Sequence, residues 1–276
     1  GNKVSLENKW SISGNIPKPL MQIEGISVLE RQILLAKKYG ITEVIICIGH
    51  QGGKIKDYFR NGSQWDLNIS YFHEDKPLGS AGALSYLSAD LEEDFLLFYG
   101  DIIMEFDIKR MIDFHNREKA DSTLLVHPND HPFDSDLIEI NEENQIKRFL
   151  LKPHDDDLIY KNLVNAGVYI LSPRLLSLIS KSKKSDLVSD VLELSLHKGF
   201  LLSAYLTPEY IKDMGTPVRY SQVSKDIAEK KLGAMSLENP QKAIFLDRDG
   251  VINREVDLLN DIEQLELIDG TVEATR

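Results

Sequence analysis

The segment FLLFYGD, Phe95 to Asp101, decides the fold, because it combines a hydrophobic strand with a carboxylate just beyond the strand's end. Apolar residues at helical spacing precede it at Ala81 to Leu87, and a second helix is expected after it at Ile108 to His115. A strand between two helices is the repeating unit of an α/β sheet with helices on both faces. Such sheets place ligands at the carboxyl ends of their strands, which is where Asp101 stands.

The same alternation extends in both directions along the chain. Further strands are expected at Glu43 to Ile48, Asn68 to Phe72, Ser122 to His127, Val164 to Leu171 and Leu201 to Tyr205. Further helices are expected at Val28 to Ala36, Ile55 to Phe59, Pro173 to Ile179, Leu187 to His197 and Ile227 to Leu232, ending at Gly233. Segments 134–140 and 145–151 flank NEEN and predict an inserted β-hairpin. The pattern predicts a Rossmann-like, three-layer α/β/α domain with a mixed, mostly parallel sheet.

The composition limits the classes of function. Of the 276 residues, 42% are hydrophobic and 28% are charged, which is typical of a globular protein. The net charge of -12 argues against nucleic acid or an anionic membrane as a partner, since both require a basic surface. No apolar run approaches the ~20 residues that span a bilayer. The single cysteine, Cys47, is expected to be a buried structural thiol, and a cytoplasmic location is expected.

The chain is expected to contain two domains joined by a linker. Residues 1–233 would form the α/β domain, 234–241 the linker, and 242–276 the truncated start of a second α/β domain. In that last stretch, the strand predicted at Ala243 to Leu246 ends in two aspartates. Asp247 could attack a phosphoryl group while Asp249 moves a proton, with Mg2+ neutralising charge.

Two small segments in the first domain could contact a phosphorylated ligand. The prolines of IPKPL hold Lys18 on a stiff support, which suits phosphate, although an ordinary solvated lysine would fit the same pattern. In PLGSAGAL, Gly79 and Gly82 would let backbone amides approach a ligand closely. The alternative is a tight connection in which Ser80 is the N-cap of the following helix.

Two carboxylates, a lysine and a polar strand complete the set of candidates. Asp101 and Asp213, the latter in IKDMGTP, are well placed for a divalent cation, although Asp101 could also cap a turn. Lys152 in LLKP repeats the lysine–proline pairing and could hold a sugar phosphate. In LVNAGVYIL, Asn165 beside Gly167 offers the donors and acceptors that sugar hydroxyls require, or is a turn residue.

The order PKPL, PLGSAGA, YGD, LKP, NAGVY and KDMGT resembles the sugar-1-phosphate nucleotidyltransferases over about residues 1–232. The resemblance implies that a nucleoside triphosphate is joined to a sugar 1-phosphate with release of pyrophosphate, by positioning and charge neutralisation. It assigns Mg2+ to Asp101 and Asp213, phosphate to Lys18, sugar phosphate to Lys152, the nucleotide to Gly79, Ser80 and Gly82, and the sugar to Asn165 and Gly167.

The start of the chain departs from the family pattern, which opens with a strand and a glycine-rich GxGTRL loop. Either Gly1 to Val4 is the tail of that loop, with Lys3 in place of the arginine and the strand lost upstream, or the loop has diverged. Lysine would keep the positive charge but lose the bidentate fork of arginine. Weak or no turnover is expected from this chain. A non-catalytic nucleotide- or sugar-binding subunit is the alternative from a different class.

FLDRDGVIN, Phe245 to Asn253, followed by Leu265 to Gly270, resembles the first motif of haloacid-dehalogenase-type phosphatases that act on sugar bisphosphates and histidinol phosphate. By that resemblance Asp247 is the nucleophile, Asp249 is the general acid/base, and both hold Mg2+. The later motifs of those phosphatases are not found in this sequence, so no hydrolysis is expected from this stretch.

A nucleotidyltransferase joined to such a phosphatase is similar to the bifunctional enzymes of nucleotide-activated heptose synthesis, a part of lipopolysaccharide or capsule biosynthesis. VHPNDHPFDSDLIEI, residues 126–140, also resembles the heptose-1-phosphate guanylyltransferase branch. GTP and D-glycero-D-manno-heptose 1-phosphate are the implied substrates, with mannose or glucose 1-phosphate and another base as the alternative. Glu74 is our hypothesis for reading guanine, and His127 and His131 could contact substrate or be ordinary loop histidines. The sequence leaves room for a homo-oligomer.

Overall fold

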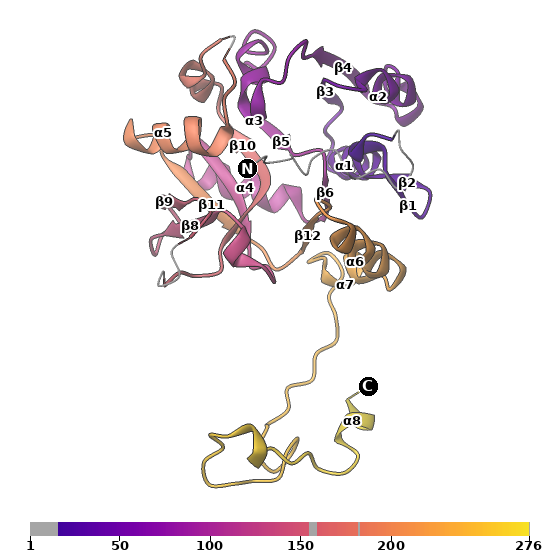
Figure 1. Cartoon of the computed structure of the whole chain (residues 1–276), viewed down its shortest axis with the longest axis vertical. Coiled ribbons are helices and arrows are strands. Elements are labelled where there is room, and N and C mark those ends of the chain that lie inside the picture. Colours follow the sequence, from indigo (N-terminus) through magenta and orange to yellow (C-terminus); the bar gives the residue numbers. More distant parts are fainter. Residues whose placement is uncertain (1–15, 155–158, 182, 276) are drawn as a thin grey trace, which may run out of the picture. The chain divides into compact units, whose positions relative to one another are not determined.

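The computed structural model describes residues 16–154, 159–181 and 183–275, so the predicted nucleotide contact Lys3 lies outside the described residues. The chain divides into two units, the first ending at Asn239 and the second beginning at Pro240 (Figure 1). The strands named here all belong to the first unit.

A six-stranded mixed sheet forms the centre of the first unit. Its order is β11 (Leu202–Leu206), β7 (Ser122–His127), β10 (Val164–Leu171), β8 (Leu137–Ile140) and β9 (Ile146–Leu150), with β5 (Phe95–Phe98) also paired to β10. β11 runs parallel to β7, whereas β10 is antiparallel to β5, β7 and β8. β8 and β9 form the predicted hairpin around residues 141–144.

Three pairs of strands lie outside the central sheet: β1 (Gln22–Ile23) with β2 (Ile26–Ser27), β3 (Glu43–Ile48) with β4 (Asn68–His73), and β6 (Ile102–Glu105) with β12 (Tyr210–Asp213). Among the described strands, parallel pairing is found for β3–β4 and β7–β11, fewer pairs than a mostly parallel sheet implies. β6 and β12 were not predicted, and they are antiparallel. These two short strands carry the candidate metal ligands, because Asp101 precedes β6 and Asp213 ends β12.

The longer helices are α1 (Val28–Lys38), α2 (Gly52–Phe59), α4 (Ile108–Glu118) and α6 (Pro217–Ala228). The shorter ones are α3 (Gly79–Gly82), α5 (Glu193–His197), α7 (Lys231–Met235) and α8 (Thr271–Ala274). Short 3₁₀-helices are η2 (Lys18–Leu20), η3 (Ser63–Trp65), η4 (Ala83–Ser85), η5 (Pro132–Asp134), η6 (Pro173–Leu178) and η8 (Ile262–Gln264), and η7 (Leu187–Leu192) is a π-helix. None of the helices in the described part of the chain combines the length and apolarity that crossing a membrane requires.

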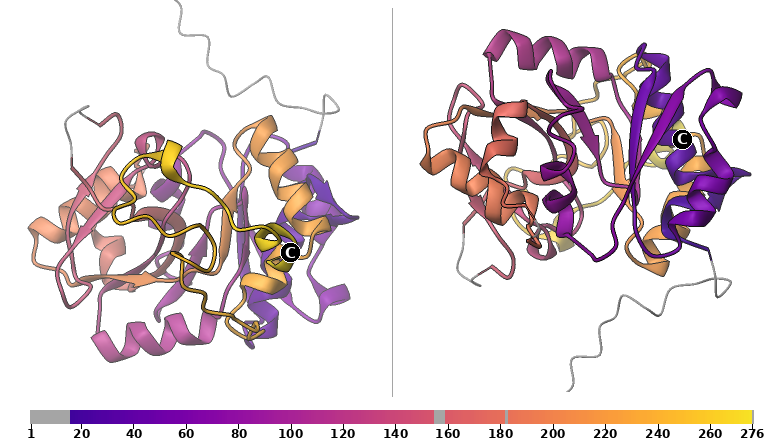
Figure 2. Two further views of the ribbon diagram at one scale, coloured as in Figure 1. Left: turned by 90° about the horizontal axis from the view of Figure 1, so that it is seen from below. Right: turned by 90° about the horizontal axis from the view of Figure 1, so that it is seen from above.

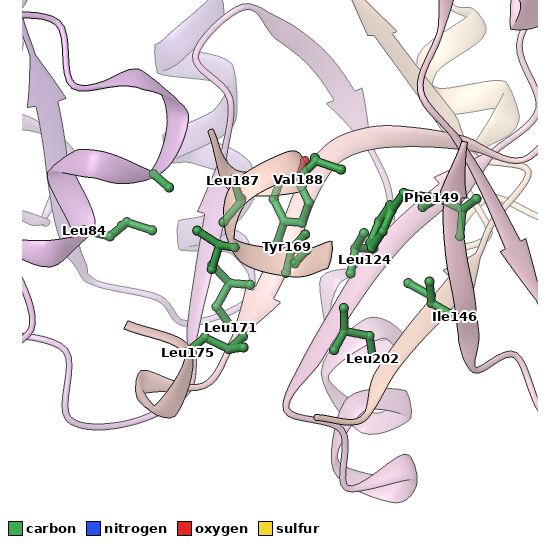
Figure 3. Close-up of a cluster of buried hydrophobic side chains, with 14 of the residues drawn as sticks. Leu84, Leu124, Ile146, Phe149, Tyr169, Leu171, Leu175, Leu187, Val188 and Leu202 are labelled. Atoms are coloured by element: carbon green, nitrogen blue, oxygen red, sulfur yellow. The ribbon is translucent and has the colours of Figure 1, made fainter. Parts of the chain in front are cut away.

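Alternate residues of the central strands point into two different hydrophobic cores. Leu124 and Tyr169 belong to the core that includes residues of η7 (Figure 3). Their neighbours Leu125 and Val168 belong to the core that includes residues of α4. The period of two that characterises a strand therefore buries both faces of the sheet. Helices lie on either side of the sheet (Figure 2), which confirms the predicted Rossmann-like α/β fold with a mixed sheet.

The first unit extends beyond the predicted end of the α/β domain. The last helix does not stop at Gly233, because α7 runs through that residue. The Leu237 amide then donates to the buried Glu209 carboxylate at 3.0 Å, and Glu238 pairs with Lys38. Residues 234–239, which the sequence suggested as linker, are therefore anchored to the first unit.

The second unit contains little regular structure. The strand predicted at Ala243 to Leu246 is not formed, and the side chains of Ile244 and Phe245 are 84% and 96% exposed. The run stays irregular because no strand among the described residues pairs with it, so its backbone lacks the hydrogen-bond partners that a strand requires. Residues 248–253 form a turn in which Gly250 has a φ of +75° and its amide donates to the Asn253 carbonyl at 2.8 Å.

Candidate active site

Asp101 lies in the tight turn that joins β5 to β6. The turn is tied to two neighbouring strands, because the Tyr99 amide donates to Gly167 O of β10 at 3.0 Å and the Met214 amide donates to Asp101 O at 2.9 Å. On the third side Pro19 packs so closely that a side-chain carbon on Gly100 would lie 3.4 Å from its ring. The backbone of Asp101 is therefore fixed by contacts from three separate parts of the chain.

Asp213 stands at the same end of this strand pair as Asp101. The register of β6 and β12 places Asp213 opposite Ile102, the residue that follows Asp101. Burial raises the pKa of Asp101, Lys18 opposes the rise with its Nζ 3.9 Å from Asp101 Oδ2, and the charge of Asp213 adds to it. A carboxylate whose pKa is raised by burial and by the charge of a neighbouring carboxylate is a place that a divalent cation would stabilise.

The donor set fits Mg2+ that arrives with phosphate ligands. Mg2+ is commonly held by one or two carboxylates, with water and substrate phosphates completing an octahedron. Asp213 Oδ1 accepts from the Gly215 amide and from Arg219 Nη1, both at 2.8 Å, which leaves Oδ2 for a cation. In residues 16–154, 159–181 and 183–275 no group of three or more His, Cys, Asp and Glu side chains forms an all-protein metal cage.

Arg219 is a candidate that sequence reasoning missed. Its Nη1 bonds Asp213, while Nη2 lies 3.3 Å from His131 Nδ1 and 3.5 Å from Asp134 Oδ2. Arg219 occupies the first turn of α6, where Thr216 Oγ1 accepts its amide at 3.3 Å. The helix dipole disfavours a cation there. An arginine three residues after the cap, just beyond a candidate metal ligand, was therefore an available signal.

Lys152 contacts the same loop as Arg219. Its Nζ donates to Asp134 O at 3.1 Å, and its amide donates to Asp136 Oδ1 at 3.2 Å. The peptide bond between Lys152 and Pro153 is cis. Two cations from different elements therefore converge on the segment around Asp134, where an anionic substrate group would find both charges.

The two predicted histidines differ in their surroundings. His131 contacts Arg219. It also contacts Asn129, whose Nδ2 lies 3.2 Å from His131 Nδ1. Burial lowers the pKa of His127 to about 4, and the charge of His131 lowers it further. A hydrogen bond with the backbone of Pro128 and the charge of Asp213 oppose this decrease. His127 is therefore neutral at physiological pH.

Gly167 allows β10 to approach the Asp101 turn. Its φ is +72°, and a side-chain carbon there would lie 2.7 Å from Ile102 Cδ1 and 2.8 Å from Tyr99 Cδ2. Asn165 closes the same irregular stretch of strand, since its Oδ1 accepts from the Gly167 amide at 3.3 Å and its Nδ2 donates to Tyr169 OH at 2.8 Å. Both residues thus shape the strand beside Asp101.

The predicted nucleotide segment packs against residues 183–187. A side-chain carbon on Gly79 would lie 2.4 Å from Ser185 O, and one on Gly82 would lie 3.0 Å from Lys183 O. Close packing of backbone against backbone is therefore a sufficient reason for both glycines. The alternative reading of Ser80 as an N-cap is wrong, because Leu78 occupies that position.

Ser80 and Glu74 instead fix the shape of this segment. Ser80 Oγ donates to Asp186 Oδ2 and accepts from the Leu187 amide, both at 2.8 Å. Glu74 Oε2 accepts from the Leu78 amide at 2.9 Å and so closes the turn before Gly79.

Cys47 lies near this segment but is exposed at the surface, so the expectation of a buried thiol is wrong. The surrounding chain nevertheless removes enough water from the thiol to raise its pKa to about 11, with a further contribution from Glu74. The thiol is therefore protonated at neutral pH, which argues against a nucleophilic role.

The aspartates of the second unit have different surroundings. Asp249 pairs with Arg248, with Asp249 Oδ2 2.9 Å from Arg248 Nη2. Arg248 lowers the pKa of Asp249, and the hydrogen bond from Asn253 lowers it further. Asp247 is exposed. A general acid needs a pKa near the working pH, and a lowered value moves Asp249 away from it. Residues 240–275 therefore supply a motif without the environment that its chemistry requires.

The comparisons with known proteins concern the first unit. A family described as Nucleotidyl transferase matches residues 9–230. Mannose-1-phosphate guanylyltransferase from Mycobacterium tuberculosis is 27% identical over 213 residues, which cover 76% of this chain and 58% of the relative. Probable mannose-1-phosphate guanylyltransferase 3 from Arabidopsis thaliana is 28% identical over 215 residues, which cover 74% and 62%. The chain thus spans less than two thirds of the length of these relatives.

Solved structures share the fold. HddC from Yersinia pseudotuberculosis, complexed with GMP-PN, has a TM-score of 0.64 at 23% identity, covering 79% of this chain and 92% of that chain. A putative glucose-1-phosphate thymidylyltransferase from Bacillus anthracis, in complex with a sucrose, has a TM-score of 0.70 at 19% identity, covering 78% and 88%. The family match ends at residue 230, so the phosphatase resemblance of residues 245–253 stays a prediction.

Proposed function

Because this chain belongs to the nucleotidyl transferase family, we propose that its first unit transfers a nucleotidyl group from a nucleoside triphosphate to a sugar 1-phosphate and releases pyrophosphate. The observation that carries the proposal is the arrangement of Asp101 and Asp213 at one end of the β6–β12 pair, with Lys18 beside Asp101 at 3.9 Å. Phosphoryl chemistry of this kind requires positioning and charge neutralisation rather than a covalent intermediate.

In the proposed reaction a phosphate oxygen of the sugar phosphate attacks the α-phosphorus, and the bond between the α-phosphorus and the bridging oxygen breaks. The sugar phosphate is already an anion, so no general base is needed. Mg2+ bound at Asp101 and Asp213 would neutralise the triphosphate. Lys18 would contact the triphosphate, and Lys152 together with Arg219 would hold the sugar phosphate. The convergence of Lys152 and Arg219 on the Asp134 segment supports this division.

GTP is the proposed nucleotide and D-glycero-D-manno-heptose 1-phosphate the proposed sugar. The names of the relatives as guanylyltransferases and the GMP-PN complex of HddC support guanine. The heptose rests on the resemblance of residues 126–140 and 245–253, and mannose or glucose 1-phosphate is the alternative. We also propose that the parent protein pairs this activity with a sugar bisphosphate phosphatase. A cytoplasmic location is supported by the single cysteine.

The test is pyrophosphate release by the full chain with each of four nucleoside triphosphates and with mannose, glucose and heptose 1-phosphates. Release should be weak, should require both substrates and Mg2+, and should be fastest with GTP. Wild-type protein that binds GTP but releases no pyrophosphate with any sugar phosphate would reject the transferase and favour the non-catalytic binding subunit.

The base preference has its own test. Glu74→Gln should reduce the preference for GTP over UTP, because a carboxylate accepts from the two adjacent donors of guanine better than an amide does. Asp75→Asn, a change at the neighbouring exposed carboxylate, is the matched control. An unchanged preference in Glu74→Gln would contradict this role.

A further inference from the structure

Gln32 is a buried polar side chain on α1, a helix that otherwise buries mainly apolar residues. It is 3% exposed, whereas the other buried residues of α1 are apolar: Val28, Ile33, Leu35 and Ala36. An apolar side chain at this position would avoid the cost of burying an amide. The amide must therefore find specific partners.

Those partners are the two carbonyls that flank the Asp101 turn. Gln32 Nε2 lies 2.8 Å from Tyr99 O and 2.7 Å from Ile102 O, so one nitrogen uses both of its protons on the two ends of a four-residue segment. A primary amide is one of the few neutral groups with two donors on a single atom. Gln32 thereby fixes the distance between the end of β5 and the start of β6.

The turn that Gln32 closes is tied to the second carboxylate as well. Met214, next to Asp213, donates its amide to Asp101 O at 2.9 Å. The turn is thus held from α1 by a side chain and from β12 by the backbone. Loss of the two Gln32 hydrogen bonds would free the Asp101 carboxylate to move relative to Asp213. Among the described residues, Gln32 donates to backbone carbonyls and not to either of these carboxylates.

We propose that Gln32 is a positioning residue for a divalent cation, acting through the Tyr99–Ile102 turn to hold the Asp101 carboxylate in register with Asp213. Its consequence for turnover rests on the proposed nucleotidyl transfer, whereas its consequence for metal affinity does not. Residues that orient metal ligands typically change affinity about 10- to 100-fold when they are lost. The effect should appear as weaker metal binding at nearly unchanged affinity for the sugar phosphate.

The experiment measures Mn2+ binding to the full chain by electron paramagnetic resonance for wild type, Gln32→Met, Gln32→Glu and Leu35→Val. Methionine keeps the length of the side chain and removes both donors, and glutamate keeps its shape. Leu35 is buried on the same helix in the core that contains Ile102, so Leu35→Val controls for general damage to packing. Asp101→Asn serves as the reference for loss of the site.

Both Gln32 variants should bind Mn2+ about 10-fold more weakly than wild type, and Leu35→Val should stay within about twofold. In turnover assays the Mg2+ concentration for half-maximal rate should rise about 10-fold, with the KM for sugar phosphate within about twofold. Folding of each variant is checked by circular dichroism, and Gln32→Glu serves as the test if Gln32→Met does not fold.

Three results would overturn the inference: wild-type Mn2+ affinity in a folded Gln32 variant, equal weakening in Leu35→Val, or no Mn2+ binding that depends on Asp101. Failure of the proposed function looks different. In that case wild type binds Mn2+ through Asp101 and the Gln32 variants weaken it, yet no pyrophosphate is released with any substrate pair.

Discussion

In each unit of this chain an apolar run is followed within three residues by an aspartate next to a glycine, yet the two runs have different structures. In the first unit Phe95–Phe98 forms β5, whose residues pair in register with Val168 to Leu171 of β10. In the second unit the run at 243–246 forms no strand, and Phe245 is 96% exposed. The same sequence pattern therefore makes a candidate site only where other strands pair with it and fix the carboxylate.

The carboxylates of the two units differ in the same way. Burial raises the pKa of Asp101, and the neighbouring Asp213 adds to the rise. Arg248, the adjacent residue in the chain, lowers the pKa of Asp249. A partly desolvated carboxylate pair attracts a cation, whereas a surface ion pair already has its partner and contributes little.

The largest effect is expected from the carboxylates themselves. Asp101→Asn should lower kcat/KM for pyrophosphate release by about 10^3-fold, because removal of a charge-stabilising group in such a site costs two to three orders of magnitude. Asp247→Asn should leave the rate within about twofold. Equal losses in the two variants would show that both units contribute to the site.

Next in size is the difference in packing. Leu125→Ala, at a fully buried position of β7, should lower the free energy of unfolding by about 3 kcal/mol in urea titrations. Phe245→Ala should change it by less than about 0.5 kcal/mol, because the ring is already in water. A substantial loss of stability in Phe245→Ala would mean that this side chain is buried in solution.

Arg219 extends the comparison to the cations. Arg219→Gln should lower kcat/KM about 30-fold and mainly raise the KM for sugar phosphate, because the guanidinium is a charged donor worth about 2 kcal/mol. Arg148→Gln removes an exposed arginine that pairs with Glu139 and should have no measurable effect. A loss in kcat alone, with KM unchanged, would argue for a role at Asp213 rather than at the substrate.

A smaller effect separates a buried aspartate from an exposed one. Burial opposes ionisation of Asp226, but hydrogen bonds from Lys231, Gln222 and Tyr210 hold its pKa below the ordinary 3.8. Its stabilising contribution is therefore present at neutral pH and is lost as the pH falls below about 3.8 and through the lower folded value. Asp226→Asn should be about 2 kcal/mol less stable at pH 7, and the gap should close in acid.

Asp249→Asn is the matched control, since its pKa is also lowered but the group lies at the surface. The free energies of unfolding of Asp249→Asn and of wild type should agree within experimental error at both pH 3 and pH 7. A gap for Asp226→Asn that persists unchanged at low pH would contradict the electrostatic explanation.

Much of the fold could be predicted from the sequence, because β7 and β10 contain apolar runs that are typical of strands buried on both faces. The short strands β6 and β12 could not, since IIME and YIKD show no clear alternation, and their pairing is what brings Asp101 and Asp213 together. Arg219 was missed because α6 was not predicted, so its unfavourable place in the first turn of a helix could not be recognised. The prediction of a strand at 243–246 was wrong because an apolar run forms a strand only when other strands are available to pair with it.

The most direct test of the account follows the fate of the α-phosphorus. The full chain is incubated with Mg2+, sugar 1-phosphate and GTP that carries a radioactive label at either the α- or the γ-phosphorus, and the products are separated. For nucleotidyl transfer we expect the α-label to enter a sugar nucleotide while the γ-label leaves in pyrophosphate, and both products to disappear in Asp101→Asn. Appearance of the γ-label in the sugar or in free phosphate, with GDP as the other product, would contradict nucleotidyl transfer.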